Sequence, residues 1–391
     1  MLSSRVPRDL TLNATARAVA ALRQRGGPLL DLTESNPTRV GIAYPPDLLT
    51  SLADPRALVY DPDPLGLSVA RDAVARDYAR RGLSVDASTV ALTASTSEAY
   101  ALVFKLLCDA GDAVLVPRPS YPLFDYLTRL ELVDAIPYPL EYHGSWRIDV
   151  DGLRRRLTPR VKAVLVVSPN NPTGSFLHGD DLDLMVSILS EHGAVLIGDE
   201  VFADYGLDPA PHARSVLSQQ AVPAFALGGL SKSVGLPQVK LGWFALAGPA
   251  HLVRDLLNAY EVIADTYLSV STPVQVAAPV LLERGQVVRT AIQERLTRNL
   301  GTLRALVAEG PELSILPVEG GWSAVVHVPT TQTEEELVLQ LLAERGVLVH
   351  PGYFFDFPRE SFVIVSLLPH PNVFDQAIAG LTAHVRGALG G

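Results

Sequence analysis

One lysine lies in a short Gly/Ser loop between two apolar runs. Lys232 stands in the segment GGLSKSVGLPQVKLGW, and each flanking run is typical of a buried strand. Most lysines in such loops are simply solvated. At the end of a buried strand, however, desolvation lowers the pKa of an amine, and a deprotonated amine is the nucleophile that forms a Schiff base with an aldehyde.

Two other polar segments also follow apolar runs directly. Asp199 and Glu200 follow AVLIG, and Asn171 lies in SPNNPTG after VKAVLVV. Acids at strand ends often cap helices, and Asn, Pro and Gly are ordinary turn residues. Aimed inward, the Asp199 carboxylate would keep a cationic ring nitrogen protonated, and Asn171 would donate a hydrogen bond to a ligand oxygen.

A Ser/Thr cluster precedes a helical pattern in LTASTSEAYALVFKLL. Ser97 and Glu98 resemble a simple N-cap, but a helix N-terminus with exposed N–H groups also binds phosphate. Lys240, eight residues beyond Lys232, offers a further charge for the same phosphate, and Tyr121 in PRPSYP offers an aromatic face for stacking.

These segments are placed by alternating strands and helices, which predict a mostly parallel α/β sheet. Loops that follow parallel strands meet at one edge of the sheet, where ligands bind. The strand candidates are 113–116, 161–167, 194–197, 224–227 and 243–247, and the helix candidates are 98–108, 120–132 and 181–192.

The pattern changes after about residue 285. A long helix is expected over 287–308, followed by alternation in SAVVHV, a helix from Thr333 and a strand over 362–367. We therefore predict an N-terminal segment (1–45) that packs on a small α+β domain (286–391), and a large domain (46–285) between them.

Composition excludes several classes of protein. The 391 residues carry a net charge of −10 and no long basic run, so no nucleic-acid partner is expected. No stretch is long and apolar enough to span a membrane, and the charged start does not resemble a signal peptide. The single cysteine, Cys108, is consistent with a reducing compartment, and we expect a cytoplasmic protein without a metal site.

Several ordered motifs together resemble the class I/II aminotransferases of PLP fold type I, the aspartate-aminotransferase superfamily. They are YDPDPLG, STSEAY, PSYP, SPNNPTG, DEVF and SKSVGLPQVKLGW, and the likeness covers roughly the whole chain. The resemblance implies a three-layer PLP-dependent transferase fold and the cofactor pyridoxal 5'-phosphate.

By that resemblance, Lys232 forms the aldimine and moves the substrate proton, Asp199 faces the pyridine nitrogen, and Asn171 faces the phenolic oxygen. Tyr121 stacks on the ring. The phosphate is bound by Thr96, Ser97, Ser231 and Lys240, and by Tyr60 of a second subunit, so the resemblance implies a homodimer with shared active sites.

Three departures from the family pattern affect the cofactor site. Phe202 stands where the family has a tyrosine, which removes a hydrogen bond to the phenolic oxygen unless Tyr205 or another group replaces it. Lys240 replaces a bidentate arginine, so the charge is a point and not a fork. Gly229 stands where a phosphate-binding serine is common.

A fourth departure affects the substrate. Ile364 occupies the place of the arginine that holds the substrate α-carboxylate, with Val363 the nearest alternative. Three explanations are open: the carboxylate site has moved to another group, the amino donor lacks a carboxylate there, or the alignment is shifted toward Arg359. We favour relocation, and the candidate substrate-binding residues are Asn36, Arg39, His350 and Arg359.

The favoured function is transfer of an amino group from an amino acid to a 2-oxo acid through the Lys232 aldimine. A β-lyase, racemase or decarboxylase would use the same lysine and cofactor, so the fold alone does not separate them. A DNA-binding regulator of this fold is disfavoured because the first 45 residues are short and poorly basic. A nicotinamide-dependent oxidoreductase is disfavoured because no G-x-G-x-x-G follows the early strands.

Overall fold

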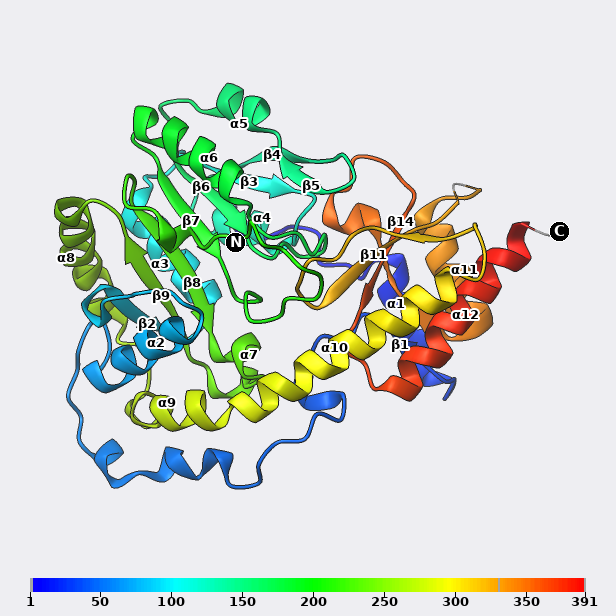
Figure 1. The fold of residues 1–391 in the computed structure, drawn as a ribbon, viewed down its shortest axis with the longest axis horizontal. Helices are drawn as coiled ribbons and strands as arrows, with labels where there is room; N and C mark the ends of the chain where they lie inside the picture. Colours follow the sequence, from blue (N-terminus) through cyan, green and yellow to red (C-terminus); the bar gives the residue numbers. More distant parts are fainter. Residues whose placement is uncertain (1–2, 330, 390–391) are drawn as a thin grey trace.

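The computed structural model describes residues 3–329 and 331–389. Its centre is an eight-stranded sheet (Figure 1). In spatial order the strands are β2 (Val90–Thr93), β9 (Gly242–Ala247), β8 (Ala224–Gly229), β7 (Val195–Asp199), β6 (Val161–Val167), β3 (Ala113–Arg118), β4 (Asp134–Tyr142) and β5 (Trp146–Ile148).

The core of this sheet is parallel and its edges are antiparallel. Strands β8, β7, β6, β3 and β4 pair in parallel, whereas β9 pairs antiparallel with β2 and β8, and β5 pairs antiparallel with β4. The prediction of a mostly parallel sheet is therefore confirmed, and the strand expected over 161–167 is found with those bounds. The sequence patterns did not reveal β2, β4 or β5.

Both faces of the sheet are buried, because successive strand residues belong to opposite hydrophobic clusters. Val195 and Ile197 pack with α3 (Thr96–Leu107), α4 (Leu123–Leu130) and α8 (Ala250–Tyr267). Leu196 packs on the other side with α2 (Ser68–Arg80), α5 (Val150–Arg156), α6 (Gly179–His192) and α9 (Thr272–Arg284). Two helical layers around one sheet confirm the three-layer prediction.

One predicted helix is shorter than expected. The helix expected over 120–132 begins at Leu123 and ends at Leu130. Tyr121 precedes Pro122, and a residue before proline is disfavoured in helical conformation, so the PRPSYP segment stays outside the helix.

The C-terminal part forms a second, smaller α+β unit. Its antiparallel sheet has the order β10 (Ser314–Ile315), β11 (Ser323–His327), β14 (Phe362–Ser366) and β13 (His350–Pro351). The helices α11 (Glu334–Arg345) and α12 (Pro371–Leu389) belong to it, and α10 (Gln286–Val307) runs toward them from the end of α9 (Figure 1).

The N-terminal segment contacts this smaller unit. Strand β1 (Leu30–Asp31) pairs in parallel with β12 (Val347–Leu348), and α1 (Ala14–Gln24) packs against α11. One hydrophobic cluster runs from Leu32 through the central sheet to Val385. The exact boundaries at residues 45 and 285 remain a prediction.

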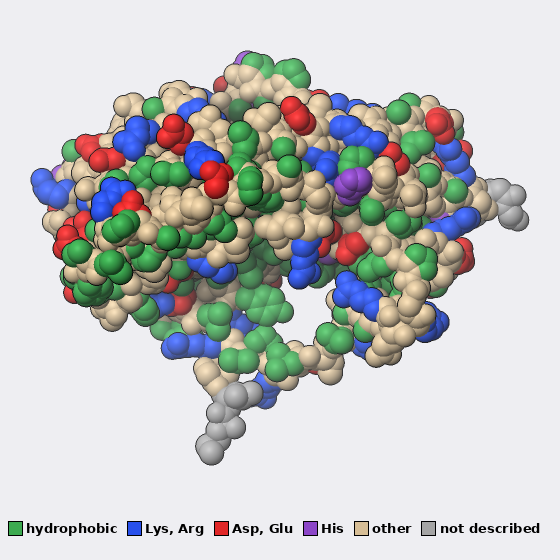
Figure 2. Space-filling model, turned by 90° about the horizontal axis from the view of Figure 1, so that it is seen from below, with side chains coloured by type: hydrophobic (Ala, Val, Ile, Leu, Met, Phe, Trp, Pro, Cys, Tyr) green, Lys and Arg blue, Asp and Glu red, His purple; other side chains and the backbone are tan. Residues whose placement is uncertain are grey.

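The surface carries mixed charges. Figure 2 shows basic, acidic and hydrophobic side chains interspersed over the face seen from below. Within the described ranges, no helix is both long and apolar enough to cross a membrane.

Candidate active site

Lys232 lies at the carboxyl end of β8, in the one-turn helix α7 (Leu230–Ser233). Burial lowers the pKa of its amine to about 8, and the nearby carboxylate of Asp199 opposes this shift. The hydroxyl of Tyr205 donates to the carbonyl oxygens of Lys232, at 2.6 Å, and of Ser233, at 3.2 Å. Arg289 Nε also donates to the carbonyl of Ser233, at 2.8 Å. The turn that carries the lysine is therefore held from two sides.

Asp199 is the last residue of β7, the strand next to β8. Its Oδ2 accepts a 2.9 Å hydrogen bond from the hydroxyl of Tyr100, and its Oδ1 accepts one from the backbone N–H of Val201 at 3.2 Å. Burial raises the pKa of Asp199 to about 6, while these two donors lower it. The carboxylate is thus mostly ionised at neutral pH although it is buried.

The adjacent acid has a different role. Glu200 forms an ion pair with Arg81 at 3.0 Å and accepts hydrogen bonds from the Ser215 hydroxyl and the Val216 N–H. These contacts account for both of its oxygens, so Glu200 is structural.

Asn171 follows β6, and the side chain of the preceding residue, Asn170, anchors the loop that contains both. The side chain of Asn170 donates to the carbonyl of Pro119 at 3.1 Å and accepts from the Ser120 hydroxyl at 3.4 Å. Asn171 stays half-buried, with its Oδ1 3.5 Å from the hydroxyl of Ser323 at the start of β11. The loop after β6 therefore contacts both the loop after β3 and the smaller sheet.

The cap of α3 differs from the prediction. Ser95, and not Ser97, is the N-cap, since its hydroxyl accepts from the N–H of Glu98 at 3.1 Å. The Glu98 carboxylate turns back to the N–H of Ala94, at 2.6 Å. Thr96 and Ser97 are then the first two helical residues, and their N–H groups have no acceptor within the helix. The N–H groups of Thr96 and Ser97 can therefore bind an anion.

The start of β9 lies directly against this helix end. A Cβ added to Gly242 would come within 2.7 Å of the Ser95 carbonyl carbon and 2.9 Å of the Thr96 nitrogen. Lys240, two residues earlier, is exposed and adopts φ +61°. This close approach brings the Lys240 backbone near the N-terminus of α3.

Position 229 has little room for a side chain. A Cβ on Gly229 would lie 3.2 Å from the Leu241 carbonyl oxygen and 3.3 Å from the Gly242 Cα. Such contacts are tight, so a side chain there would require the β9 backbone to shift by a few tenths of an ångström. Ser231, in the first turn of α7, is half-buried.

Two predicted tyrosines are exposed in the single chain. Tyr121 is 44% exposed beside the Ser120–Asn170 contact, and Tyr60 is 73% exposed. The residues before Tyr60 are also apolar and exposed, Leu58 at 89% and Val59 at 65%. Exposure of three adjacent apolar residues is unusual and is typical of a surface that contacts another chain.

An aromatic group lies over the lysine. The Lys232 nitrogen is 4.8 Å from the ring centre of Trp322 and 5.5 Å from that of Phe202. Tyr205 does not supply the missing phenol of position 202, because its hydroxyl donates to backbone carbonyls behind the lysine. Trp322 was not anticipated from the sequence. The only signal was its place between a glycine pair and a strand.

Ile364 belongs to an apolar cluster. It is 1% exposed in β14 and packs with Trp146, Phe355, Phe357 and Phe362. Its strand partners are Val325 and His350, and Ser323, two residues before Val325, contacts Asn171. Residues two apart point to the same face of a strand, so Ile364 is on the face that meets the active-site loops.

His350 is therefore the predicted substrate residue that lies beside Ile364. Its ring stacks on Phe354 with centres 5.2 Å apart, and burial lowers its pKa while Asp31 opposes the shift. A histidine with a lowered pKa is mostly neutral at pH 7. It can hydrogen-bond a substrate but supplies little charge.

The other predicted substrate residues lie at opposite ends of β14. The backbone carbonyl of Glu34 accepts a 2.8 Å hydrogen bond from the Ser366 hydroxyl, at the end of β14 that pairs with Ser323. Asn36 then precedes the 3-10 turn η1 (Pro37–Arg39), and Arg39 ends it. The Asn36 side chain caps this turn by accepting from Thr38, whereas Arg39 is exposed. Arg359 is exposed before Phe362, at the far end of the strand, so the structure does not bring it to the other site residues.

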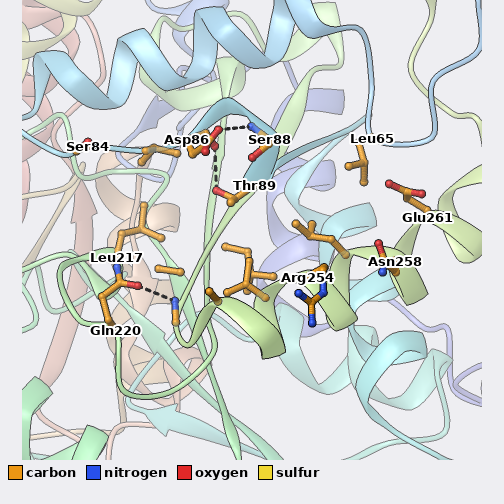
Figure 3. A pocket seen from close by; sticks show the side chains of 17 residues that line it. Leu65, Ser84, Asp86, Ser88, Thr89, Leu217, Gln220, Arg254, Asn258 and Glu261 are labelled. Atoms are coloured by element: carbon orange, nitrogen blue, oxygen red, sulfur yellow. Dashed lines mark hydrogen bonds between the residues drawn. The ribbon is translucent and has the colours of Figure 1, made fainter.

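A separate cavity lies elsewhere on the molecule. It has a volume of about 530 Å³ and is lined by Asp86 and Thr89 before β2 and by Arg254, Asn258 and Glu261 of α8 (Figure 3). None of the candidate site residues lines it.

The family follows from a comparison with known proteins. The model of the family "Aminotransferase class I and II" matches residues 46–377. The chain belongs to this family. It is a PLP-dependent aminotransferase, and the fold and the cofactor implied by the sequence motifs are confirmed.

Several similar proteins are named as alanine aminotransferases or as glutamate-pyruvate aminotransferases. The chain is 26% identical to the glutamate-pyruvate aminotransferase AlaA of Haemophilus influenzae over 92% of this chain and 91% of that protein. It is 28% identical to the alanine aminotransferase of Mycobacterium tuberculosis over 90% of this chain and 84% of that protein. The solved alanine aminotransferase of Pyrococcus furiosus shares the fold, with a TM-score of 0.88, 23% identity and coverage of 99% and 100% of the two chains.

The described residues fit pyridoxal phosphate. A buried amine with a lowered pKa and an ionised carboxylate held by two donors lie at the carboxyl ends of the neighbouring strands β8 and β7. The N-terminus of α3, whose first N–H groups have no acceptor within the helix, follows β2 on the other side of β9. These features match, in turn, the aldehyde, the ring nitrogen and the phosphate of the cofactor.

Proposed function

We propose that this aminotransferase attaches its cofactor to Lys232 and uses the same nitrogen to move the substrate proton. The observation that carries the proposal is the buried Lys232 amine, whose pKa of about 8 lies close to neutral pH. At pH 7 roughly a tenth of the amine is therefore unprotonated and able to attack an aldehyde, and at pH 8 about half is. A pKa near the working pH also suits a group that must both accept and donate a proton.

Asp199 is proposed to hold the ring nitrogen in its protonated form. When bound, the cofactor supplies an electron sink through its pyridine ring, which is effective when that nitrogen is charged. Tyr100 keeps the carboxylate ionised by donating to Oδ2, and the Val201 N–H fixes the other oxygen. A buried anion without a partner would itself take up a proton, so these donors are part of the role.

The phosphate is proposed to lie at the N-terminus of α3. Thr96 and Ser97 contribute N–H groups and hydroxyls, Ser231 a hydroxyl and Lys240 a charge. The contact between Gly242 and Ser95 supports this grouping, because it brings the β9 end and the helix end together. Asn171 is proposed to donate to the phenolic oxygen, and Tyr121 to stack on the ring.

The substrate carboxylate is proposed to bind on the Arg39 side of β14. Ile364 offers no charge, and its aromatic neighbours leave a guanidinium no partner. Arg39 lies on the segment tied to Ser366, with His350 as the neutral polar group beside Ile364. Relocation to Arg39 is thus favoured over the alignment shift toward Arg359.

The substrates are proposed to be a small amino acid and a 2-oxo acid, as the names of the relatives suggest. The exposed Leu58–Tyr60 surface supports a homodimer in which Tyr60 reaches the partner's phosphate site. The cytoplasmic location remains a prediction from the single cysteine.

Two measurements test this function. Borohydride reduction followed by peptide mass mapping should leave the cofactor on Lys232, and a label on Lys240 or on no lysine would overturn the assignment. A screen of amino acids against pyruvate and 2-oxoglutarate should yield the corresponding oxo acid and the aminated acceptor. Release of ammonia or carbon dioxide without an aminated acceptor would favour a lyase or a decarboxylase instead.

A further inference from the structure

The loop that precedes β11 is fixed to the segment after the Asn171 loop by the side chain of Glu319. Its Oε2 accepts the backbone N–H of Phe176 at 2.7 Å, and its Oε1 lies 2.9 Å from Nε2 of His178. Both partners lie just after the Asn171 loop. Glu319 and His178 are largely buried, so the pair is protected from solvent.

Backbone hydrogen bonds complete this attachment. The N–H of Gly320 donates to the carbonyl of Gly174 at 2.9 Å, and the N–H of Gly321 donates to the carbonyl of Tyr205 at 2.8 Å. The carbonyl of Glu319 accepts from Leu207 at 2.8 Å. The segment 319–321 is therefore held between the loop after β6 and the loop after β7.

Gly320 has no space for a side chain. A Cβ there would lie 2.7 Å from the Phe176 ring and 2.7 Å from the Tyr205 carbonyl oxygen. Gly206, its bridge partner, has open space at the same place. The close approach at position 320 thus depends on glycine.

This attachment places Trp322. The indole is 3% exposed, with ring centres 5.3 Å from Phe202 and 5.4 Å from Tyr205. The Lys232 nitrogen lies 4.8 Å from the Trp322 ring centre and 5.5 Å from that of Phe202. Both distances are within the range of about 6 Å at which an aromatic face attracts an ammonium group.

We propose that Trp322 and Phe202 form an aromatic wall that favours the protonated form of the Lys232 nitrogen, and that segment 319–321 fixes this wall. The proposal rests on the proposed role of Lys232. It identifies Trp322 as a residue that contacts the reacting nitrogen.

The charge balance around Lys232 supports this effect. Burial disfavours the ammonium form, and Asp199 is the charged group that acts in the opposite direction. An aromatic face attracts the ammonium and has little effect on the neutral amine. Trp322 and Phe202 therefore add to the action of Asp199 and make Lys232 a stronger proton acceptor when it is released from the cofactor.

The test measures the pKa of Lys232 in the cofactor-free protein by NMR of isotope-labelled lysine. The chain has four lysines, Lys105, Lys162, Lys232 and Lys240, so a Lys232→Arg variant assigns the signal. Trp322→Leu removes the aromatic face but keeps an apolar side chain, and Trp322→Phe keeps a face. We expect Trp322→Leu to lower the pKa by about half to one unit and Trp322→Phe by less than half of that amount.

A second pair of variants tests the attachment without a charge change. Gly320→Ala should displace the segment and lower the Lys232 pKa in the same direction as Trp322→Leu, while Gly206→Ala should leave it unchanged. Equal shifts in Trp322→Leu and Trp322→Phe, or no decrease in Trp322→Leu and Gly320→Ala, would overturn the proposal. Failure of the borohydride mapping would instead overturn the proposed function, so the two failures are distinguishable.

Discussion

The hydroxyl of the buried Tyr100 donates a 2.9 Å hydrogen bond to Oδ2 of Asp199, which is partly buried. This contact joins helix α3, whose first residues face the phosphate site, to the end of β7. Burial raises the pKa of Asp199, whereas the Val201 N–H and the Tyr100 hydroxyl both lower it, so these donors increase the ionised fraction of the carboxylate at neutral pH.

Tyr100→Phe tests this contact. Loss of a hydrogen bond to a charged group, about 1.5 kcal/mol, should raise the pKa of Asp199 by about one unit from its value of about 6. NMR titration of the cofactor-free protein, with Asp199→Asn to assign the signal, should show this increase. An unchanged titration of Asp199 would show that its pKa does not depend on Tyr100.

Asp199→Asn should raise the stability of the cofactor-free protein at pH 8 and lower the activity of the enzyme. Folding raises the pKa of Asp199 to about 6, so the folded protein favours the protonated carboxyl. The resulting contribution to the free energy of unfolding is complete below about pH 4 and is lost as the pH rises to about 6 and above. The neutral amide avoids this cost, which for two pKa units is about 3 kcal/mol. The cofactor-free variant should therefore be more stable than the native protein at pH 8, and about equally stable at pH 3.5.

The same variant should retain the cofactor but lose at least about 100-fold in kcat, as expected when a buried electrostatic stabiliser is removed. Denaturant titration and steady-state kinetics on one preparation measure both effects. Undiminished turnover would remove the role assigned to Asp199, and lower stability at pH 8 would contradict the cost of burying its charge.

Tyr205→Phe tests how the lysine turn is held. The variant leaves the carbonyls of Lys232 and Ser233 with fewer donors, at a cost of about 1–3 kcal/mol for a buried unsatisfied group. We expect a lower melting temperature and a kcat that falls more than KM rises, because the position of Lys232 matters to the chemical step. An unchanged melting temperature together with an unchanged kcat would contradict the assignment.

The sequence predicted the placement of polar residues best where they directly follow an apolar strand. Lys232, Asp199 and Asn171 lie after β8, β7 and β6, and parallel pairing brings the carboxyl ends of these strands together regardless of distance along the chain. Their roles in the site remain predictions. The three-layer fold followed from the same alternation of strands and helices.

Residues that reach the site from other elements were missed. Tyr100 approaches Asp199 from a helix, and Trp322 approaches Lys232 from the smaller unit, so no local pattern marks either. The N-cap was misplaced by two residues because Ser95 and Ser97 are equivalent by type, and only the turn geometry separates them. Strands of two residues, such as β12 and β13, carry no periodicity to detect.

Arg39 and Arg359 are both exposed but lie toward opposite ends of β14. A charged hydrogen bond to a substrate carboxylate contributes about 1.5–3 kcal/mol, which corresponds to roughly 10- to 100-fold in affinity. Arg39→Gln should therefore raise KM for amino acid donors by about 10-fold or more with little change in kcat. Arg359→Gln should leave both constants within about twofold, because surface substitutions away from such contacts have small effects. If Arg359→Gln raised KM and Arg39→Gln did not, the carboxylate would bind at the opposite end of the strand from the one proposed.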